Sequence, residues 1–379
     1  MQTELMEASD AALAAAPTGD SGPAVDDLVR ERLAPRVVAI DQEGEYPEDF
    51  LRELGALGGF SAHLAAPEGR ADMIGAIDTM DRVSRECLST GFLTWCQDAC
   101  AWYVDNSENR GLRETYLPGI GSGSQLAGTG LSNPLKHFSG IESLRLKAWP
   151  VPGGYRVNGT LPWVSNLGPD HQFAAIFQVE GRDQRHVMAL VDCASEGLDL
   201  QPTQPFIALE GTRTLVCRFD NVFIPEERIV ADPVGPYLER IKAGFILLQL
   251  GMAQGMVRGC IDGMRELEDQ LGHVNAYLDD RPDELEEELA DAATTGAELA
   301  ADPFTPGDDY LHEVLQLRLN GGELALRAAN SYMLHAGARG YQATAAAQRR
   351  LREAIFVAIV TPATKHLRRE IATLEERLG

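Results

Sequence analysis

The sequence predicts an α+β multidomain protein in which two helical regions flank a middle β region along the chain. Three observations support this order. Apolar residues recur at helical spacing before residue 116, short apolar runs with β character lie between about residues 123 and 232, and helical spacing returns after Leu238. The chain has 379 residues, 44% of them apolar and 24% charged, as in ordinary globular proteins. This length predicts two or three domains with a sizeable core.

The first predicted region is helical and covers residues 24–122. Phe50, Leu51, Leu54 and Leu57 follow steps that place them on one helix face, and residues 73–103 have the pattern of a longer helical stretch. Pro118 and the glycines after it mark its end. Residues 1–23, which precede it, are rich in Ala, Gly, Asp and Ser, and this composition predicts a disordered N-terminus.

The second predicted region, residues 123–232, is a β-barrel domain. Apolar runs at 173–179 and 187–191, and a partly alternating run at 215–222, have the length and spacing of short strands. Pro225 and Pro233 close the region.

The third predicted region, residues 233–379, is a helical domain resembling a four-helix bundle. Helical patterns cover residues 238–272, 308–336 and 343–376. Between the first two lies an acidic insert at 274–307, whose segment 279–291 holds eight acids and one arginine. Such a charge run predicts a solvated surface, formed by an exposed helix or by a loop.

Composition excludes several classes of function. The net charge is −24, and this acidic surface repels nucleic acid and anionic membranes. The apolar run at 243–256 contains Gln249 and is too short to cross a bilayer, and the N-terminus lacks a signal-peptide pattern. The six cysteines have no short metal-binding spacing, so we expect no metal site and reduced thiols. These features predict a cytoplasmic protein.

The most informative segment runs from Gly153 to Asn166. It reads GGYRVNG, then LPWVSN, and resembles the "GGY-x-x-NG-x-x-x-W-I-[TS]-N" block of the acyl-CoA dehydrogenase superfamily. The resemblance implies a fold in which two α-domains sandwich a β-barrel, and FAD as cofactor. It also implies that Trp163 and Val164 lie beside the isoalloxazine ring, with the Ser165 hydroxyl directed toward flavin N5. Thr129, in the run LAGT, stands where the family uses a threonine to hydrogen-bond the ring.

Two further segments carry the resemblance and supply substrate-binding candidates. Residues 210–225 are similar to the family's "G-x-R-[GS]-[ST]-x-x-x-x-F-x-[DN]-V-x-V-P" run, which places Arg213 near the flavin or the substrate. Lys242 stands where the family has an arginine near the acyl end of the substrate. Lysine is a point charge without the planar fork of arginine, so this exchange is not neutral.

The chain departs from the family at the catalytic base. Thr361 occupies the usual position of the glutamate, and Ile241 occupies the alternative position used by a few members. α,β-Dehydrogenation requires a base for the α-proton, and its loss costs roughly 10²–10⁴-fold in rate. Other candidate bases are Glu210, Glu239, His137 and His335, none of which has the family position. The arginine and glutamine that contact the FAD pyrophosphate across a subunit interface have no clear match either.

The expected function is therefore that of an atypical family member lacking the usual catalytic Glu. It would act on the CH–CH group of an acyl thioester, of CoA or a carrier protein, with hydride transfer to flavin N5. The alternatives are a two-component flavin monooxygenase on the same fold and a non-catalytic fold relative. The resemblance further implies an electron-transferring flavoprotein as acceptor and a homodimer or homotetramer.

Overall fold

The N-terminal region of the computed structural model, which describes residues 22–64, 71–181 and 185–379, is helical, as the periodicity predicts. The predicted disordered segment 1–23 lies almost wholly outside the described residues. The Asp72 side chain caps the N-terminus of α5 (Met73–Glu86), since its carboxylate accepts from the Gly75 backbone N–H at 2.9 Å. The helices are α2 (Gly22–Leu28), α3 (Val37–Gln42), α4 (Glu48–Ala56), α5 (Met73–Glu86), α6 (Leu88–Asp105) and α7 (Arg110–Gly121).

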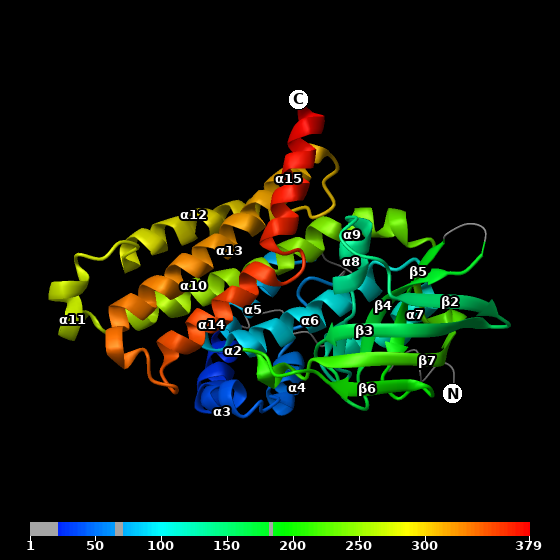
Figure 1. Ribbon diagram of the computed structural model, residues 1–379, viewed down its shortest axis with the longest axis horizontal. Coiled ribbons are helices and arrows are strands. Elements are labelled where there is room, and N and C mark those ends of the chain that lie inside the picture. Colours follow the sequence, from blue (N-terminus) through cyan, green and yellow to red (C-terminus); the bar gives the residue numbers. More distant parts are fainter. Residues whose placement is uncertain (1–21, 65–70, 182–184) are drawn as a thin grey trace.

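Helix α6 is the central element of the molecule. All of its residues from Leu88 to Val104 are buried, which explains why its sequence is apolar on every side. Extended backbone at Cys87 separates it from α5. It packs against α5, α7, α9 (Val234–Leu248) and strand β1 (Ala127–Thr129), and so lies between the helices and the sheet (Figure 1).

The middle region forms one eight-stranded sheet within the described residues, ordered β6-β7-β3-β2-β4-β5-β8, with β1 paired to β4. The expected β-barrel is wrong in one respect, because the sheet does not close. β6 pairs only with β7 at one edge, and the three-residue strand β8 pairs only with β5 at the other. The elements are β1 (Ala127–Thr129), α8 (Ser132–Phe138), β2 (Leu146–Val151), β3 (Gly154–Val164), β4 (Gln172–Val179), β5 (His186–Asp192), β6 (Leu198–Pro202), β7 (Leu215–Pro225) and β8 (Ile229–Ala231).

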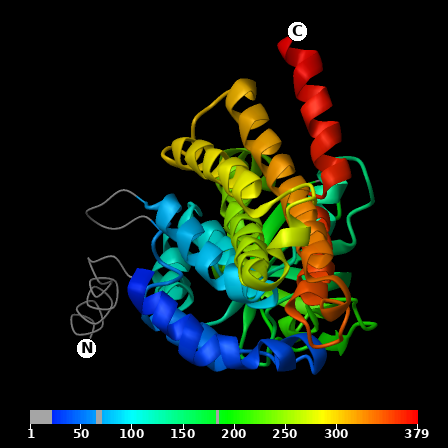
Figure 2. The same cartoon turned by 90° about the vertical axis from the view of Figure 1, so that its left-hand side faces the viewer.

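The C-terminal region is a helical bundle built around α10 and α13. Helix α13 covers the residues that the periodicity predicts, and α12, α14 and α15 pack against it (Figure 1). Helix α15 ends at the top of both views, and its last turns contact the start of α13, where Arg377 pairs with Asp308 at 3.2 Å and His312 Nε2 lies 3.4 Å from Glu375 (Figure 2). The helices are α9 (Val234–Leu248), α10 (Leu250–Arg265), α11 (Glu268–Asn275), α12 (Pro282–Ala300), α13 (Asp308–Ala336), α14 (Ala346–Ile359) and α15 (Thr364–Leu378).

The acidic insert is an integral helix of this bundle. Most of it forms α12, and Leu285 and Leu289 on its inner face are buried against the bundle core. Its acids lie on the outer face, as amphipathic spacing requires. The changes between helix and strand fall beside the boundaries expected near residues 122 and 232, and the division into domains stays a prediction.

The apolar segment Val234–Arg265, which comprises α9 and α10, is long and apolar enough to cross a membrane by length and composition. In the structure, 89% of its most apolar window is buried among other helices. It is therefore a core element of the bundle, and its hydrophobicity is explained by packing.

Candidate active site

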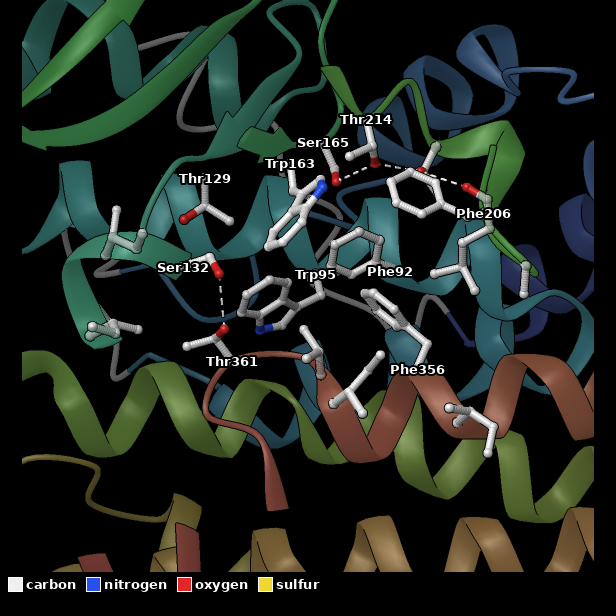
Figure 3. A pocket seen from close by; sticks show the side chains of 18 of the residues that line it. Phe92, Trp95, Thr129, Ser132, Trp163, Ser165, Phe206, Thr214, Phe356 and Thr361 are labelled. Carbon is white, nitrogen blue, oxygen red and sulfur yellow. Dashed lines mark hydrogen bonds between the residues drawn. The ribbon is translucent and has the colours of Figure 1, made fainter. Parts of the chain in front are cut away.

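A cavity of about 330 Å³ lies where the sheet meets helices α6, α9 and α14 (Figure 3). One wall comes from the sheet and its loops and carries small hydroxyl residues around Trp163. The opposite wall comes from the helices and is mostly aromatic or aliphatic. The sheet wall includes Thr129, Trp163, Ser165, Thr212 and Thr214, and the helix wall includes Phe92, Trp95, Phe245, Phe356, Ile359 and Thr361.

The backbone at the end of β3 is unusual and presents Trp163 to the cavity. Trp163 and Asn166 have φ of 61° and 64°, a region that residues other than glycine seldom adopt. The Asn166 side chain holds this conformation, since its Nδ2 donates to the Ala127 carbonyl at 2.8 Å and its Oδ1 accepts from Tyr46 at 2.7 Å. As a result the Trp163 side chain is 53% exposed, with its ring facing the cavity.

Strand β1 lies unusually close to this segment. A Cβ at Gly128 would lie 2.1 Å from the Ser165 carbonyl oxygen, so glycine is required there. This approach brings Thr129 to the same wall as Ser165. The Thr129 hydroxyl lies 3.1 Å from the Tyr103 hydroxyl, whose pKa burial raises far above its usual range. Tyr103 therefore stays protonated at neutral pH.

A chain of hydroxyl groups follows the sheet wall. Ser165 Oγ lies 2.6 Å from Thr214 Oγ1, which lies 2.7 Å from Thr212 Oγ1 (Figure 3). Thr212 donates to the Leu209 carbonyl at 2.7 Å. Because Thr212 donates its proton to a carbonyl, both hydroxyl contacts are made when Thr214 donates to Thr212 and Ser165 donates to Thr214. Ser165 donates into the cavity only when one of these two bonds is broken.

The segment after α14 forms the end of the helix wall. Thr361 Oγ1 lies 3.1 Å from Ser132 Oγ, and the Thr361 carbonyl accepts from Gln249 at 2.9 Å. Gln249 accepts in turn from the fully buried Arg318 at 2.6 Å. Burial lowers the pKa of Arg318 to about 10, which leaves it charged at neutral pH. A buried cation therefore holds the position of the Thr361 segment.

A second cavity of about 360 Å³ adjoins the first and shares Leu131, Leu135 and Phe245 with it. Four of its polar residues form one cluster, which α9, α15 and the end of α8 contribute. Lys242 Nζ lies 3.0 Å from Glu370, and His366 Nε2 lies 2.5 Å from Ser139 Oγ and 3.5 Å from Glu370. Burial acts to raise the pKa of Glu370, but the His366 hydrogen bond and the Lys242 charge outweigh it and hold the pKa at about 2.

The structure brings together some of the predicted site residues and separates others. Thr129, Trp163, Ser165 and Thr361 all line the first cavity. Val164 is buried and does not line it. Ile241 and Lys242 line the second cavity with Glu239. Arg213 lies outside both, over the Tyr46 ring at 4.1 Å and 3.2 Å from Glu48.

No described aspartate, glutamate or histidine lines the first cavity. Of the other candidate bases, Glu210 accepts from the Phe206 N–H, and His335 is buried at the far end of α13 with its ring bonded to the Ser331 carbonyl. His137 contacts Phe138 and His186 outside both cavities. None of these three groups faces the cavity.

One cluster outside the cavities has metal-ligand chemistry. Glu48, Asp170 and His171 each bring one ligand atom to within 4.8 Å of the others. Arg52 pairs with both carboxylates, at 3.0 and 3.1 Å, so its charge already neutralises the acids. The expected absence of a metal stays a prediction.

Sequence reasoning missed the aromatic wall, Thr214 and Ser132. Thr214 directly follows Arg213 in a recognised motif, and this adjacency could have identified it. Phe92 and Trp95 are three residues apart on α6 and were indistinguishable from core residues, because α6 is apolar on all sides. Ser132 and Thr361 are 229 residues apart, and only the fold shows that they meet.

Comparisons with known proteins agree with this architecture. A profile described as "Acyl-CoA dehydrogenase, N-terminal domain" matches residues 23–124. An isovaleryl-CoA dehydrogenase of Oryza sativa is 26% identical over 252 residues, which cover 63% of this chain and 60% of that protein. The chain therefore spans about three-fifths of the length of that relative. An acyl-CoA dehydrogenase of Bacillus subtilis is 23% identical over 351 residues, covering 87% of this chain and 90% of that protein.

The structural likeness extends over almost the whole chain. A solved glutaryl-CoA dehydrogenase in complex with glutaryl-CoA superposes with a TM-score of 0.84 at 18% identity, covering 95% of both chains. That likeness establishes the fold. Over almost its whole length the chain has the fold of acyl-CoA dehydrogenases, and residues 23–124 match the N-terminal domain of that family.

Proposed function

We propose that this protein is an FAD-dependent oxidoreductase that dehydrogenates the CH–CH group of an acyl thioester. The observation that carries the proposal is the pairing of two unlike walls around one cavity. An exposed tryptophan and a chain of hydroxyl groups form one wall, and apolar side chains of helices form the other.

The residues present fit the isoalloxazine part of FAD. A flat, apolar ring with a polar edge needs an aromatic surface on one face and hydrogen-bonding groups at its rim. Trp163 supplies the surface, and Thr129, Ser165 and Thr214 supply the hydroxyls. The strained backbone at Trp163 supports the same assignment, because strain of this kind is concentrated at functional sites.

FAD, when bound, supplies a hydride acceptor. The residues of this chain exclude water, donate hydrogen bonds and bind the substrate. Trp163 and the helix wall exclude water from the reacting carbons. The Ser165 hydroxyl can turn away from Thr214 and donate toward developing negative charge. Ser132 and Thr361 place two hydroxyls on the opposite wall. Lys242, paired with Glu370 at 3.0 Å, lines the second cavity and is assigned to the polar arm of a thioester, from CoA or a carrier protein.

A second function, two-component flavin monooxygenation, is favoured by one specific observation. The described residues around the first cavity include no carboxylate or imidazole to take an α-proton. Monooxygenation does not require removal of that proton from a thioester. For dehydrogenation by this chain, the group that accepts the α-proton has to be one that does not line the first cavity.

Visible absorbance of the purified protein with added FAD tests the proposal. We expect bound, yellow FAD that is bleached by anaerobic addition of mixed acyl-CoA thioesters. Bound FAD that no acyl-CoA or acyl-carrier-protein thioester bleaches would exclude dehydrogenation and favour the monooxygenase. Refusal of FAD and FMN would instead indicate a non-catalytic relative.

The remaining partners are part of the same proposal. An electron-transferring flavoprotein would reoxidise the flavin, and a homodimer or homotetramer would form in the cytoplasm. Sedimentation equilibrium of the loaded protein would measure the assembly.

A further inference from the structure

Four aromatic rings close the helix wall of the first cavity. Phe92 and Trp95 on α6 stack at 5.7 Å between ring centroids, at an interplanar angle of 17°. Phe356 on α14 meets the Phe92 ring edge-on at 4.5 Å, and Phe245 on α9 lies 5.3 Å from Trp95. Because three helices contribute, no single rotation of one side chain opens this wall. These four residues are referred to below as the aromatic plug.

The plug also continues into the core behind it. Tyr103 stacks on Phe245 at 6.0 Å, and Phe92, Trp95 and Phe245 are 7%, 3% and 4% exposed. The space between α6 and α9 is therefore filled by rings. An extended apolar chain entering from the cavity would have to displace them.

The volume of the first cavity also indicates that little room is left for an acyl group. At about 330 Å³ it lies near the lower limit of ligand pockets, which is about 300 Å³. In the proposed function, this space must hold a tricyclic ring and the reacting carbons together. The room left beyond those carbons is small.

The two cavities give the substrate a direction. Both are lined by Leu131, Leu135 and Phe245, and the chain passes from one to the other between Thr361 and Pro362. Two cations line the first cavity, namely Lys136, which lies 5.4 Å from the centre of the Trp163 ring, and Arg352, which pairs with Asp41 at 2.5 Å. The second cavity has the cluster of Lys242, His366 and Glu370, and we place the polar arm of the thioester there. The acyl group then enters the first cavity and ends against Phe92 and Trp95.

We infer that the aromatic plug restricts this protein to thioesters with short acyl groups, of propionyl or butyryl size, and excludes those of octanoyl size. This inference rests on the proposed function, since it assigns the acyl group to the cavity that Trp163 faces. One methylene too many in an apolar pocket changes discrimination by about 10–200-fold. An octanoyl chain, with four more carbons than butyryl, is excluded by the same packing.

The test uses the FAD-loaded protein with propionyl-, butyryl- and octanoyl-CoA. Binding is measured by perturbation of the visible absorbance of FAD, and reduction is measured by its bleaching. We expect the two short thioesters to bind at least 100-fold more tightly than octanoyl-CoA. Equal or tighter binding of octanoyl-CoA by the unmodified protein would overturn the inference.

Variants test whether the aromatic plug causes the preference for short thioesters. Phe92→Ala should reduce the preference for butyryl- over octanoyl-CoA by at least about 10-fold. Phe356→Ala removes a half-buried ring from the same contact, is less demanding for folding, and should move the preference in the same direction. Leu93→Ala is the matched control, because Leu93 is buried beside Phe92 on α6 but lies in a separate apolar cluster. It should lower stability without changing the preference.

Different results would contradict the role of the aromatic plug and the proposed dehydrogenation. Short thioesters that bind selectively without bleaching FAD would support the plug and contradict dehydrogenation. Bleaching by all three thioesters at equal rates would support dehydrogenation and contradict the plug. An unchanged preference in both Phe92→Ala and Phe356→Ala, with both variants folded, would also contradict it.

Discussion

Trp163 carries both the local strain and the chemistry of the site. Its positive φ is held by the bonds of Asn166, and its ring is more than half exposed beside the cavity. An exposed indole contributes little to folding, since burial is what stabilises large apolar side chains. The exposed ring of Trp163 is therefore explained by contact with a ligand and not by packing in the hydrophobic core.

Trp163→Ala should weaken FAD binding by about 10–100-fold and leave the melting temperature of the apoprotein nearly unchanged. The expected loss comes from the aromatic contact and the apolar area covered by the ring. Fluorescence titration with FAD measures the affinity. Trp149→Ala on β2 is the matched control, because Trp149 is 45% exposed and lies outside both cavities. Equal losses in the two variants would contradict the role given to Trp163.

The sequence predicted the residues of the sheet wall better than those of the helix wall. Trp163 and Ser165 lie in a dense local motif whose turn and strand residues leave little freedom. Phe92 and Phe356 are 264 residues apart and meet only after the bundle assembles. Arg213, expected near the flavin or the substrate, lies outside both cavities. Its own positive φ of 43° turns the side chain toward Tyr46 and Glu48.

At the scale of elements, helix periodicity was a reliable guide and sheet closure was not. α13 has a continuous apolar stripe, which fixes its length. Closure of a sheet depends on edge strands, and the last strand is only three residues long. The acids of segment 279–291 obscured the buried leucines of α12, so its place in the bundle could not be predicted from charge alone.

The contact between α9 and α15 predicts a pH dependence. Glu370 has a folded-state pKa of about 2, below its ordinary value of 4.5. Its contribution to stability is therefore complete above about pH 4.5 and is lost as pH falls through about 2. Glu370→Gln should lower the free energy of unfolding by on the order of 2–3 kcal/mol at pH 7, and the deficit should shrink toward pH 2.

Urea unfolding at pH 7, 5 and 3 checks this expectation. Glu376→Gln, an exposed position on the same helix, provides the control and should change stability little at any of these pH values. A deficit for Glu370→Gln that stays constant from pH 7 to pH 3 would show that Lys242 and His366 do not stabilise the ionised carboxylate.

At the scale of the whole molecule, the net charge of −24 is the dominant electrostatic feature. Self-repulsion among acids destabilises the compact state, and salt screens it over a Debye length of about 10 Å at 0.1 M. Lysine and arginine residues in the two cavities therefore stand in an acidic field. That field opposes the approach of anionic thioesters at low ionic strength.

Raising sodium chloride from 0.01 to 0.3 M should increase the melting temperature by roughly 2–5 °C. Differential scanning fluorimetry measures this change, and potassium chloride at equal ionic strength should give the same increase. A fall in melting temperature with salt would mean that attractive ion pairs outweigh the net repulsion.

The close approach of Gly128 to the Ser165 carbonyl has a practical consequence for protein engineering. The geometry of the sheet wall is fixed by backbone, whereas the helix wall is made of replaceable side chains. A combinatorial library that holds residues 126–129 and 161–166 constant and randomises positions 92, 245 and 356 would vary selectivity while preserving the redox chemistry. Substrate selectivity and redox chemistry depend on separate segments of the chain, so each can be changed without the other.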